Sequence, residues 1–285
     1  MNIIYNELLK NHTSFKIGGP ADQFCSVTSV DEIIELLDYA KKENIPVTIM
    51  GNGSNLLVSD KGIRGLVIKI AKGFDDIAID GTKVVAESGI LLSKLANLAL
   101  KAGLTGLEFA SGIPGTLGGA VCMNAGAYDG EMKDVVKKVV FYKDGKVQET
   151  EDLDFGYRHS VFPDTDAVVL SVEMELREGN YDEIKAKMED FSQRRSDKQP
   201  LSQPSAGSTF KRPEGYFAAK LIEDSGLKGF KIGGAMVSDK HAGFVVNTGD
   251  ATCEDVLELV AHIKATVLEK FGVEIQEEIK ILGEF

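Results

Sequence analysis

The segment from residue 110 to residue 132 reads ASGIPGTLGGAVCMNAGAYDGEM and contains six glycines but no charged residue before Asp129. Glycine lacks a Cβ, so its backbone can adopt positive φ and can lie directly against a bound group. Successive amide N–H groups in such a segment can cradle a phosphate or line one face of a flat ring. The other interpretation is a hairpin of small residues buried between two layers.

A second loop of the same kind, MGNGSNLLVSD, spans residues 50–60 and favours the ligand-binding interpretation. It follows a short β-prone run at 47–50, the position that a dinucleotide-binding glycine motif would occupy. The Rossmann pattern requires a third glycine and then a helix. Here Leu56 stands at the third glycine position and LLVSD is typical of a strand, so the sequence argues against a Rossmann fold.

Composition limits the possible classes of protein. With 285 residues and 43% hydrophobic content, the chain can bury a large core and is expected to form about two domains. The net charge of −12 argues against non-specific nucleic-acid binding, which needs a basic surface. Residues 205–241 are the exception, because six basic and four acidic residues give this segment a charge of +2. It either binds an anionic small molecule or forms an ordinary lysine-rich surface.

Targeting, redox and metal signals are weak. The first ten residues carry Glu7 and Lys10, which argues against a secretory signal, and no stretch is apolar enough to cross a bilayer. We therefore expect a cytoplasmic protein. Cys25, Cys122 and Cys253 are widely spaced, so they are predicted to be small core residues and not disulfides. The four histidines lack metal-ligand spacing, so no metal is expected.

Hydrophobic periodicity and turn residues predict an α+β chain. Asp144-Gly145 predicts a hairpin turn, and the Ser- and Pro-rich run at 196–207 is the best linker candidate. Helices are expected from Ser29 to about residue 44, at 91–102, from Asn180 to about Arg195, at 215–226 and at 252–271. Strands are expected at 47–50, between 65 and 87, on both sides of the hairpin turn, at 168–176, between 232 and 247 and at 273–283.

Three residues stand out as candidates for chemistry. Glu278 follows Glu277 in an apolar strand, where alternation points one of the two carboxylates inward. An inward carboxylate is costly unless it is paired or functional. Arg158 lies among apolar neighbours and is suited to two-point binding of a carboxylate, whereas Ser208 follows a glycine that can expose its hydroxyl. Structural interpretations exist for all three, and no GxSxG motif surrounds the serine.

Eight motifs across nearly the whole chain resemble one family, the bacterial UDP-N-acetylmuramate dehydrogenases, also called UDP-N-acetylenolpyruvoylglucosamine reductases. They occur in the family's order, with spacing like that of its shorter subtype. The motifs are NHTSFKIGGPA, MGNGSNLLVSD, SGIPGTLGGAVCMNAGAYDGE, YRHSVF, PSAGSTFKRP, LIEDSGLKG, HAGFVVN and EEIKILG.

The resemblance implies a fold and a division into domains. Residues 1–200 would form an FAD-binding domain of the vanillyl-alcohol-oxidase type, with two subdomains split near residue 75. Residues 205–285 would form a smaller α+β domain that binds a UDP-sugar. The last strand, 273–285, is expected to pack back toward the flavin site.

The resemblance also implies an activity. NADPH would pass a hydride to non-covalently bound FAD, and the enolpyruvyl ether of UDP-N-acetylglucosamine would then receive that hydride from the reduced flavin. Arg158 and Glu278 match the pair that polarises the substrate carboxylate, and Ser208 matches the proton donor. Lys220 and Asn247 are weaker candidates for binding the UDP-sugar. The residues that match the FAD site are Asn52, Gly53, Ser54, Asn55, Leu56, Gly112, Thr116, Gly118 and Gly119.

Two other functions stay open at this point. One is a different FAD-dependent oxidoreductase of the same fold, such as an oxidase of a small alcohol, whose reduced flavin would react quickly with oxygen. The other is a non-catalytic sugar-nucleotide-binding protein, which would purify without colour.

Overall fold

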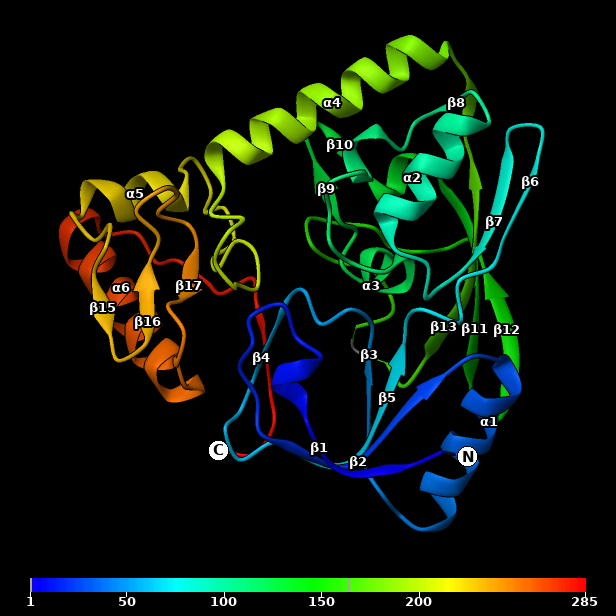
Figure 1. Ribbon diagram of the computed structural model, residues 1–285, viewed down its shortest axis with the longest axis horizontal. Coiled ribbons are helices and arrows are strands. Elements are labelled where there is room, and N and C mark those ends of the chain that lie inside the picture. Colours follow the sequence, from blue (N-terminus) through cyan, green and yellow to red (C-terminus); the bar gives the residue numbers. More distant parts are fainter. Residues whose placement is uncertain (1, 164) are drawn as a thin grey trace. The chain divides into compact units, whose positions relative to one another are not determined.

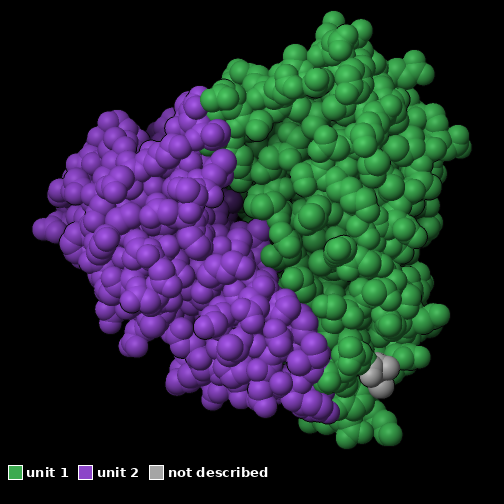
Figure 2. Space-filling view, in the orientation of Figure 1, with its two compact units in different colours: residues 1–3, 25–52, 67–195 green, residues 4–24, 53–66, 196–285 purple. Residues whose placement is uncertain are grey.

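The computed structural model describes residues 2–163 and 165–285, and the chain divides into two compact units (Figure 2). Cys25–Asn52 and Val67–Arg195 make up most of unit 1. Unit 2 comprises Ile4–Phe24, Gly53–Leu66 and Ser196–Phe285. Two early segments therefore group with the C-terminal residues, a division that differs from the one expected between residues 200 and 205. Both units contain helices and mainly antiparallel strands, so the α+β class is confirmed.

Unit 1 contains a five-stranded antiparallel sheet in the order β12-β11-β13-β7-β6 (Figure 1). Alternate residues of β13, such as Val172 and Met174, are fully buried in the core of this unit. The predicted hairpin turn joins β11 and β12, with Asp144 and Gly145 at φ 52° and 77°. The strands are β6 (Ile77–Asp80), β7 (Lys83–Glu87), β11 (Val136–Lys143), β12 (Lys146–Thr150) and β13 (Val168–Glu175).

The predicted helices of unit 1 form at the expected positions. In α1 (Val30–Lys42), the Ser29 hydroxyl accepts a hydrogen bond of 3.2 Å from the N–H of Glu32, so Ser29 caps the helix. Helix α2 (Leu92–Lys101) ends before Gly103, which adopts φ 70°. Helix α4 (Tyr181–Lys198) begins after Asn180 and continues three residues beyond the predicted end. Its last residues therefore belong to the stretch predicted to be a linker.

The glycine-rich segment contains a helix that its composition does not predict. Helix α3 (Leu117–Cys122) includes Gly118 and Gly119, and glycine is a poor helix former. Close packing explains why glycine occupies position 118, because a Cβ there would lie 2.9 Å from the Cβ of Ser88. The segment also contains the end of η2 (Glu108–Ala110), the short strands β9 (Gly126–Ala127) and β10 (Gly130–Glu131), and the start of η3 (Met132–Asp134).

Unit 2 packs two helices against a small sheet. Helix α6 (Cys253–Phe271) is capped by Thr252, whose hydroxyl accepts a hydrogen bond from the Asp255 N–H, and it ends at Gly272 with φ 66°. The predicted final strand forms only as β18 (Lys280–Leu282), which pairs in parallel with β4 (Leu56–Val58) (Figure 1). The other elements are α5 (Ala218–Asp224), β15 (Lys231–Ile232), β16 (Ala235–Val237) and β17 (Val245–Asn247).

Four strands form a sheet in the order β1-β2-β5-β3. Strands β2 and β5 each have residues in both units, because a boundary between the units falls inside each of them. The elements of this region are β1 (Ile4–Leu8), η1 (Leu9–Asn11), β2 (Pro20–Val27), β3 (Val47–Met50) and β5 (Ile63–Ile70), and the remaining pair is β8 (Leu104–Thr105) with β14 (Arg177–Glu178). Within the described part of the chain, no helix has the length and apolar character needed to span a membrane.

Candidate active site

The two glycine-rich segments meet within unit 1. The side-chain amide of Asn52 donates a hydrogen bond of 2.7 Å to the C=O of Pro114. A Cβ on Gly51 would lie 2.3 Å from the hydroxyl oxygen of Thr116, so only glycine fits there. These two contacts join residues that are 62 and 65 positions apart in the sequence. They bring Asn52 and Thr116, both predicted FAD ligands, to one site.

The first loop offers hydrogen-bond donors. None of the N–H groups of residues 51–55 donates to another described residue. Gly53 adopts φ 65°, and a Cβ there would lie 2.2 Å from the C=O oxygen of His12, so the loop conformation depends on glycine. A loop with unused N–H groups and a left-handed residue is the kind of concave donor site that binds a diphosphate. The residues present therefore fit the diphosphate of FAD.

Polar groups are also available at the start of α3. The N–H groups of Leu117 and Gly118 are used by the C=O groups of Ile90 and Ser88, each at 2.8 Å. The N–H of Gly119, in contrast, has no acceptor among the described residues. The hydroxyl oxygen of Ser88 is buried and likewise lacks a partner in the described structure. Gly119 is exposed, so water can satisfy its N–H in the free protein, whereas an unsatisfied buried hydroxyl such as that of Ser88 is costly in a protein that binds nothing there.

Arg158 lies in unit 1 on a strained turn. Its backbone adopts φ 54°, which is uncommon for a residue with a long side chain. The half-buried guanidinium lies 5.1 Å from the centre of the Tyr157 ring and donates a long hydrogen bond of 3.5 Å to the C=O of Gly126. The side chain is thus held by an aromatic ring and by the end of the glycine-rich segment. Backbone strain of this kind is often found at functional sites.

Ser208 and Glu278 lie on paired segments of unit 2. Gly207 adopts φ 82°, and the following Ser208 is exposed, as the sequence predicts. The next residue, Thr209, is 1% exposed, and its C=O accepts a hydrogen bond of 2.8 Å from the N–H of Glu278. Two residues further on, the N–H of Lys211 donates to the C=O of Gln276. This pairing sets Ser208 and Glu278 near each other.

Glu277 and Glu278 are both partly buried, so burial does not single out one of them as the predicted inward carboxylate. The chain at these residues is not a regular strand, so simple alternation does not apply. Glu277 forms an ion pair of 2.8 Å with Lys264. The backbone of Glu278 is tied to the first glycine loop, because its C=O accepts a hydrogen bond of 3.2 Å from the side-chain amide of Asn55. A predicted FAD ligand and a predicted catalytic residue therefore lie side by side.

The two candidates for UDP-sugar binding differ in accessibility. Lys220 is exposed and forms an ion pair of 2.6 Å with Asp224. Asn247 is 4% exposed, and its amide already donates to the C=O of Phe15 and accepts from two backbone N–H groups. Asn247 thus has a structural role in unit 2, whereas the Lys220 ammonium is at the surface.

His241 supports the Ser208 segment, a role that the sequence does not reveal. Its Nδ1 atom accepts a hydrogen bond of 3.2 Å from the N–H of Gly243, whose C=O accepts from the N–H of Thr209 at 2.8 Å. The Thr209 hydroxyl in turn accepts from the N–H of Val245 at 2.9 Å. Burial lowers the pKa of His241 and so favours the neutral ring that this arrangement needs.

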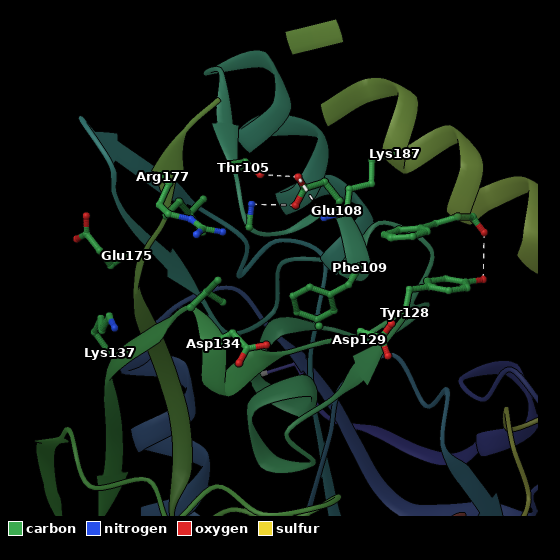
Figure 3. A pocket seen from close by; sticks show the side chains of 15 residues that line it. Thr105, Glu108, Phe109, Tyr128, Asp129, Asp134, Lys137, Glu175, Arg177 and Lys187 are labelled. Carbon is green, nitrogen blue, oxygen red and sulfur yellow. Dashed lines mark hydrogen bonds and ion pairs between the residues drawn. The ribbon is translucent and has the colours of Figure 1, made fainter. Parts of the chain in front are cut away.

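A cavity of about 500 Å³ opens elsewhere in unit 1 (Figure 3). Glu108, only 4% exposed, lies in its wall and accepts hydrogen bonds from the Thr105 hydroxyl and from the Gly106 N–H, at 2.5 and 2.8 Å. Lys187 lies 3.9 Å from the same carboxylate. None of the predicted catalytic or FAD-binding residues is among the described residues that line this cavity.

The three cysteines form no disulfide bond in the described structure. Cys25 and Cys253 are buried and Cys122 is partly buried, and all three are free thiols in the described structure. Burial raises the pKa of Cys122 to about 11 and that of Cys253 to about 12. Neither is therefore a thiolate near neutral pH, in agreement with the prediction that they are core residues.

Comparison with known proteins agrees with this geometry. Residues 21–151 match the family model described as an FAD-binding domain, and they include both glycine-rich segments. The fold and the donor-rich loops thus define an FAD-binding protein. Residues 199–282 match the model of the C-terminal domain of UDP-N-acetylenolpyruvoylglucosamine reductase.

Similarity over the full length identifies the family. A protein from Caldanaerobacter subterraneus subsp. tengcongensis, named UDP-N-acetylenolpyruvoylglucosamine reductase, is 56% identical over 98% of this chain and 93% of its own length. A protein of the same name from Clostridioides difficile is 52% identical over 99% and 94%. The crystal structure of the Thermus caldophilus enzyme of that name matches with a TM-score of 0.87 and 38% identity, over 99% of both chains. This chain belongs to the UDP-N-acetylenolpyruvoylglucosamine reductase family.

Proposed function

We propose that this protein reduces the enolpyruvyl ether of UDP-N-acetylglucosamine to UDP-N-acetylmuramate, a step of peptidoglycan precursor synthesis. The observation that carries the proposal is the 56% identity over 98% of the chain to a protein named for this activity. Both glycine-rich segments, the Arg158 turn and the Ser208 segment lie within that similarity. NADPH is the proposed hydride donor, and FAD is proposed to be bound without a covalent link.

The reaction adds a hydride and a proton across one carbon–carbon double bond. Bound FAD supplies the hydride chemistry, which no amino-acid side chain provides. In our proposal, the Arg158 guanidinium binds the substrate carboxylate in two-point fashion. Negative charge that develops between the double bond and the carboxylate is then stabilised by a charge already in place.

Ser208 is the proposed proton donor. Its exposed hydroxyl, next to a glycine at φ 82°, is available to a bound substrate. The hydroxyl would give its proton to one carbon of the double bond and recover a proton from water afterwards. Glu278 is proposed to act with Arg158 on the carboxylate, and Lys220 to contribute to UDP-sugar binding in unit 2. The backbone ties of Glu278 to Thr209 and Asn55 support placing Glu278 beside Ser208 and the first glycine loop within unit 2.

Anaerobic rapid mixing tests the proposal. The purified protein should be yellow, should release its flavin on denaturation, and should be bleached by NADPH. Adding the enolpyruvyl substrate without oxygen should restore the colour and yield the reduced sugar nucleotide. An oxidase of the same fold would regain its colour with oxygen and ignore the enolpyruvyl substrate, and a non-catalytic binding protein would show no flavin cycle. Either result would overturn the assignment.

A further inference from the structure

Helix α4 brings an arginine against the second glycine-rich segment. A Cβ on Gly112 would lie 3.2 Å from Cδ of Arg195 and 3.5 Å from its Nη1 atom. Gly112 does not have a positive φ, so the close approach of Arg195, and not a torsion angle, is what favours glycine at this position. The guanidinium therefore lies directly over the backbone of a predicted FAD ligand, within unit 1.

The orientation of α4 explains this placement. Arg195 is four residues after Phe191, so the two side chains lie on the same face of the helix. Phe191 is stacked on the ring of Tyr128 at 4.4 Å, and its C=O accepts a hydrogen bond of 3.0 Å from the Tyr128 hydroxyl (Figure 3). The tip of the β9–β10 hairpin thus fixes α4 one turn before Arg195. The arginine is held toward the glycine-rich segment.

No compensating charge for Arg195 is found among the described residues. Among the described residues no carboxylate forms an ion pair with it, although burial lowers the pKa of its guanidinium. A partly buried cation without an anion is costly, and protein interiors normally pair such groups. The preceding residue shows the contrast, because Arg194 is 57% exposed and forms an ion pair of 2.7 Å with Asp190.

We propose that Arg195 binds an anionic group of the bound flavin nucleotide. The inference rests on the proposed function only in requiring that FAD is bound, and does not depend on which substrate is reduced. Two parts of FAD can supply the negative charge: the diphosphate, and the N1–C2=O edge of the ring when the flavin is reduced. A guanidinium suits either, since it presents several N–H donors in a fixed plane.

The test compares Arg195→Gln with Arg194→Gln as a matched control, in the FAD-loaded enzyme. If Arg195 binds the diphosphate, Arg195→Gln should release FAD about 10- to 100-fold more readily, as expected for one charged hydrogen bond. The midpoint potential of the bound flavin should then be unchanged. If Arg195 binds the ring edge, the potential should fall, because the reduced anion loses its partner, while FAD release changes little. Arg194→Gln should match wild type in both measurements.

Two results would overturn the inference. One is Arg195→Gln with wild-type flavin release and wild-type potential. The other is an Arg195→Lys protein that folds normally by circular dichroism yet is as impaired as Arg195→Gln, since a retained charge should rescue binding in part. Flavin content and substrate turnover of the wild-type enzyme are measured first. A wild type that binds FAD but does not reduce the enolpyruvyl substrate would refute the proposed function and leave the Arg195 comparison valid.

Discussion

The N–H of Glu278 donates a hydrogen bond of 2.8 Å to the C=O of Thr209, the residue that follows Ser208. Thr209 is 1% exposed, and its hydroxyl and N–H are both used by the segment from Gly243 to Val245. A buried and fully hydrogen-bonded residue therefore fixes the backbone directly after the proposed proton donor. The proposed catalytic serine can be exposed without being mobile, because its neighbour is anchored.

Replacement of Thr209 by Val tests this anchor. Valine keeps the shape of threonine but leaves the N–H of Val245 without its acceptor, which should cost about 1–3 kcal/mol of the free energy of unfolding. Thr209→Ser retains the hydroxyl and should cost less. Urea unfolding of the three proteins gives the comparison. A Thr209→Val protein as stable as wild type would show that this hydrogen bond does not anchor the segment.

Replacement of Ser208 by Ala should separate the two half-reactions. The hydroxyl is exposed, so the variant should fold, bind FAD and accept hydride from NADPH normally. Reoxidation of its flavin by the enolpyruvyl substrate should slow by about 10²- to 10⁴-fold, the usual contribution of a positioned proton donor. Ser208→Cys, which keeps a donor, should retain more activity. Stopped-flow reoxidation within a few-fold of wild type would make Ser208 a turn residue.

Replacement of Arg158 by Lys should affect the same half-reaction by a different route. Lysine keeps the charge but loses two-point binding of a carboxylate, which should raise the barrier by about 2–4 kcal/mol. Reduction of the flavin by NADPH should change much less. A similar slowing of both half-reactions would instead point to damage of the flavin site, since Arg158 also contacts the C=O of Gly126.

The role of the first glycine loop in FAD binding can be tested by comparing Gly53, in the loop, with Gly145, in the β11–β12 turn. Both have a positive φ. Gly53→Ala and Gly145→Ala should each cost about 1–2 kcal/mol of backbone strain. At Gly145 nothing lies within 4 Å of the added Cβ, whereas at Gly53 the Cβ would lie 2.2 Å from the His12 carbonyl oxygen. Only Gly53→Ala should therefore lose FAD as well as stability. Flavin content after purification is the measurement, and equal retention by both variants would contradict a role of the loop in FAD binding.

His241 predicts a loss of stability in acid. Burial lowers its pKa in the folded protein, so protonation favours unfolding. Its contribution is complete above the unfolded pKa of about 6.5 and is lost as the pH falls through the lower folded value. The charged groups that also affect the pKa of His241 are Lys228, Glu223 and Lys198. In urea unfolding at about pH 8 and about pH 5.5, His241→Asn should lose less stability on acidification than wild type, because an amide oxygen can accept from Gly243 without titrating. An identical loss in both proteins would assign the acid sensitivity to other groups.

Local sequence signals predicted the regular elements well. The caps of α1 and α6, the glycine after α2 and the Asp144-Gly145 turn act through neighbouring residues, so a single sequence can show them. Helix α3 was not predicted, since Gly118 becomes helical through its packing on Ser88. Strand β1 was likewise not predicted.

The site residues, too, could be predicted where their role depends on neighbouring residues, and not where it depends on contacts distant in sequence. The glycine loops, the exposed Ser208 and the family resemblance pointed to the right segments. The prediction of one inward carboxylate assumed strand alternation, which the irregular backbone at Glu277 and Glu278 does not provide. Arg195 and His241 were not singled out, since their importance comes from contacts with Gly112 and Gly243. The contact of Arg195 joins residues 83 positions apart.

The parallel pairing of β4 with β18 has a consequence for synthesis of the chain. Leu57, fully buried, belongs to the same core as Ile275 and Ile279, more than 200 residues later. Pairings so distant in sequence form slowly, because a long loop must close first. Phe15, Ile17 and Leu57 therefore stay without the rest of this core until residues 206–279 have been synthesised. In the cell, this enzyme should depend on chaperones that shield an emerging N-terminus, more than a protein whose first domain can fold by itself.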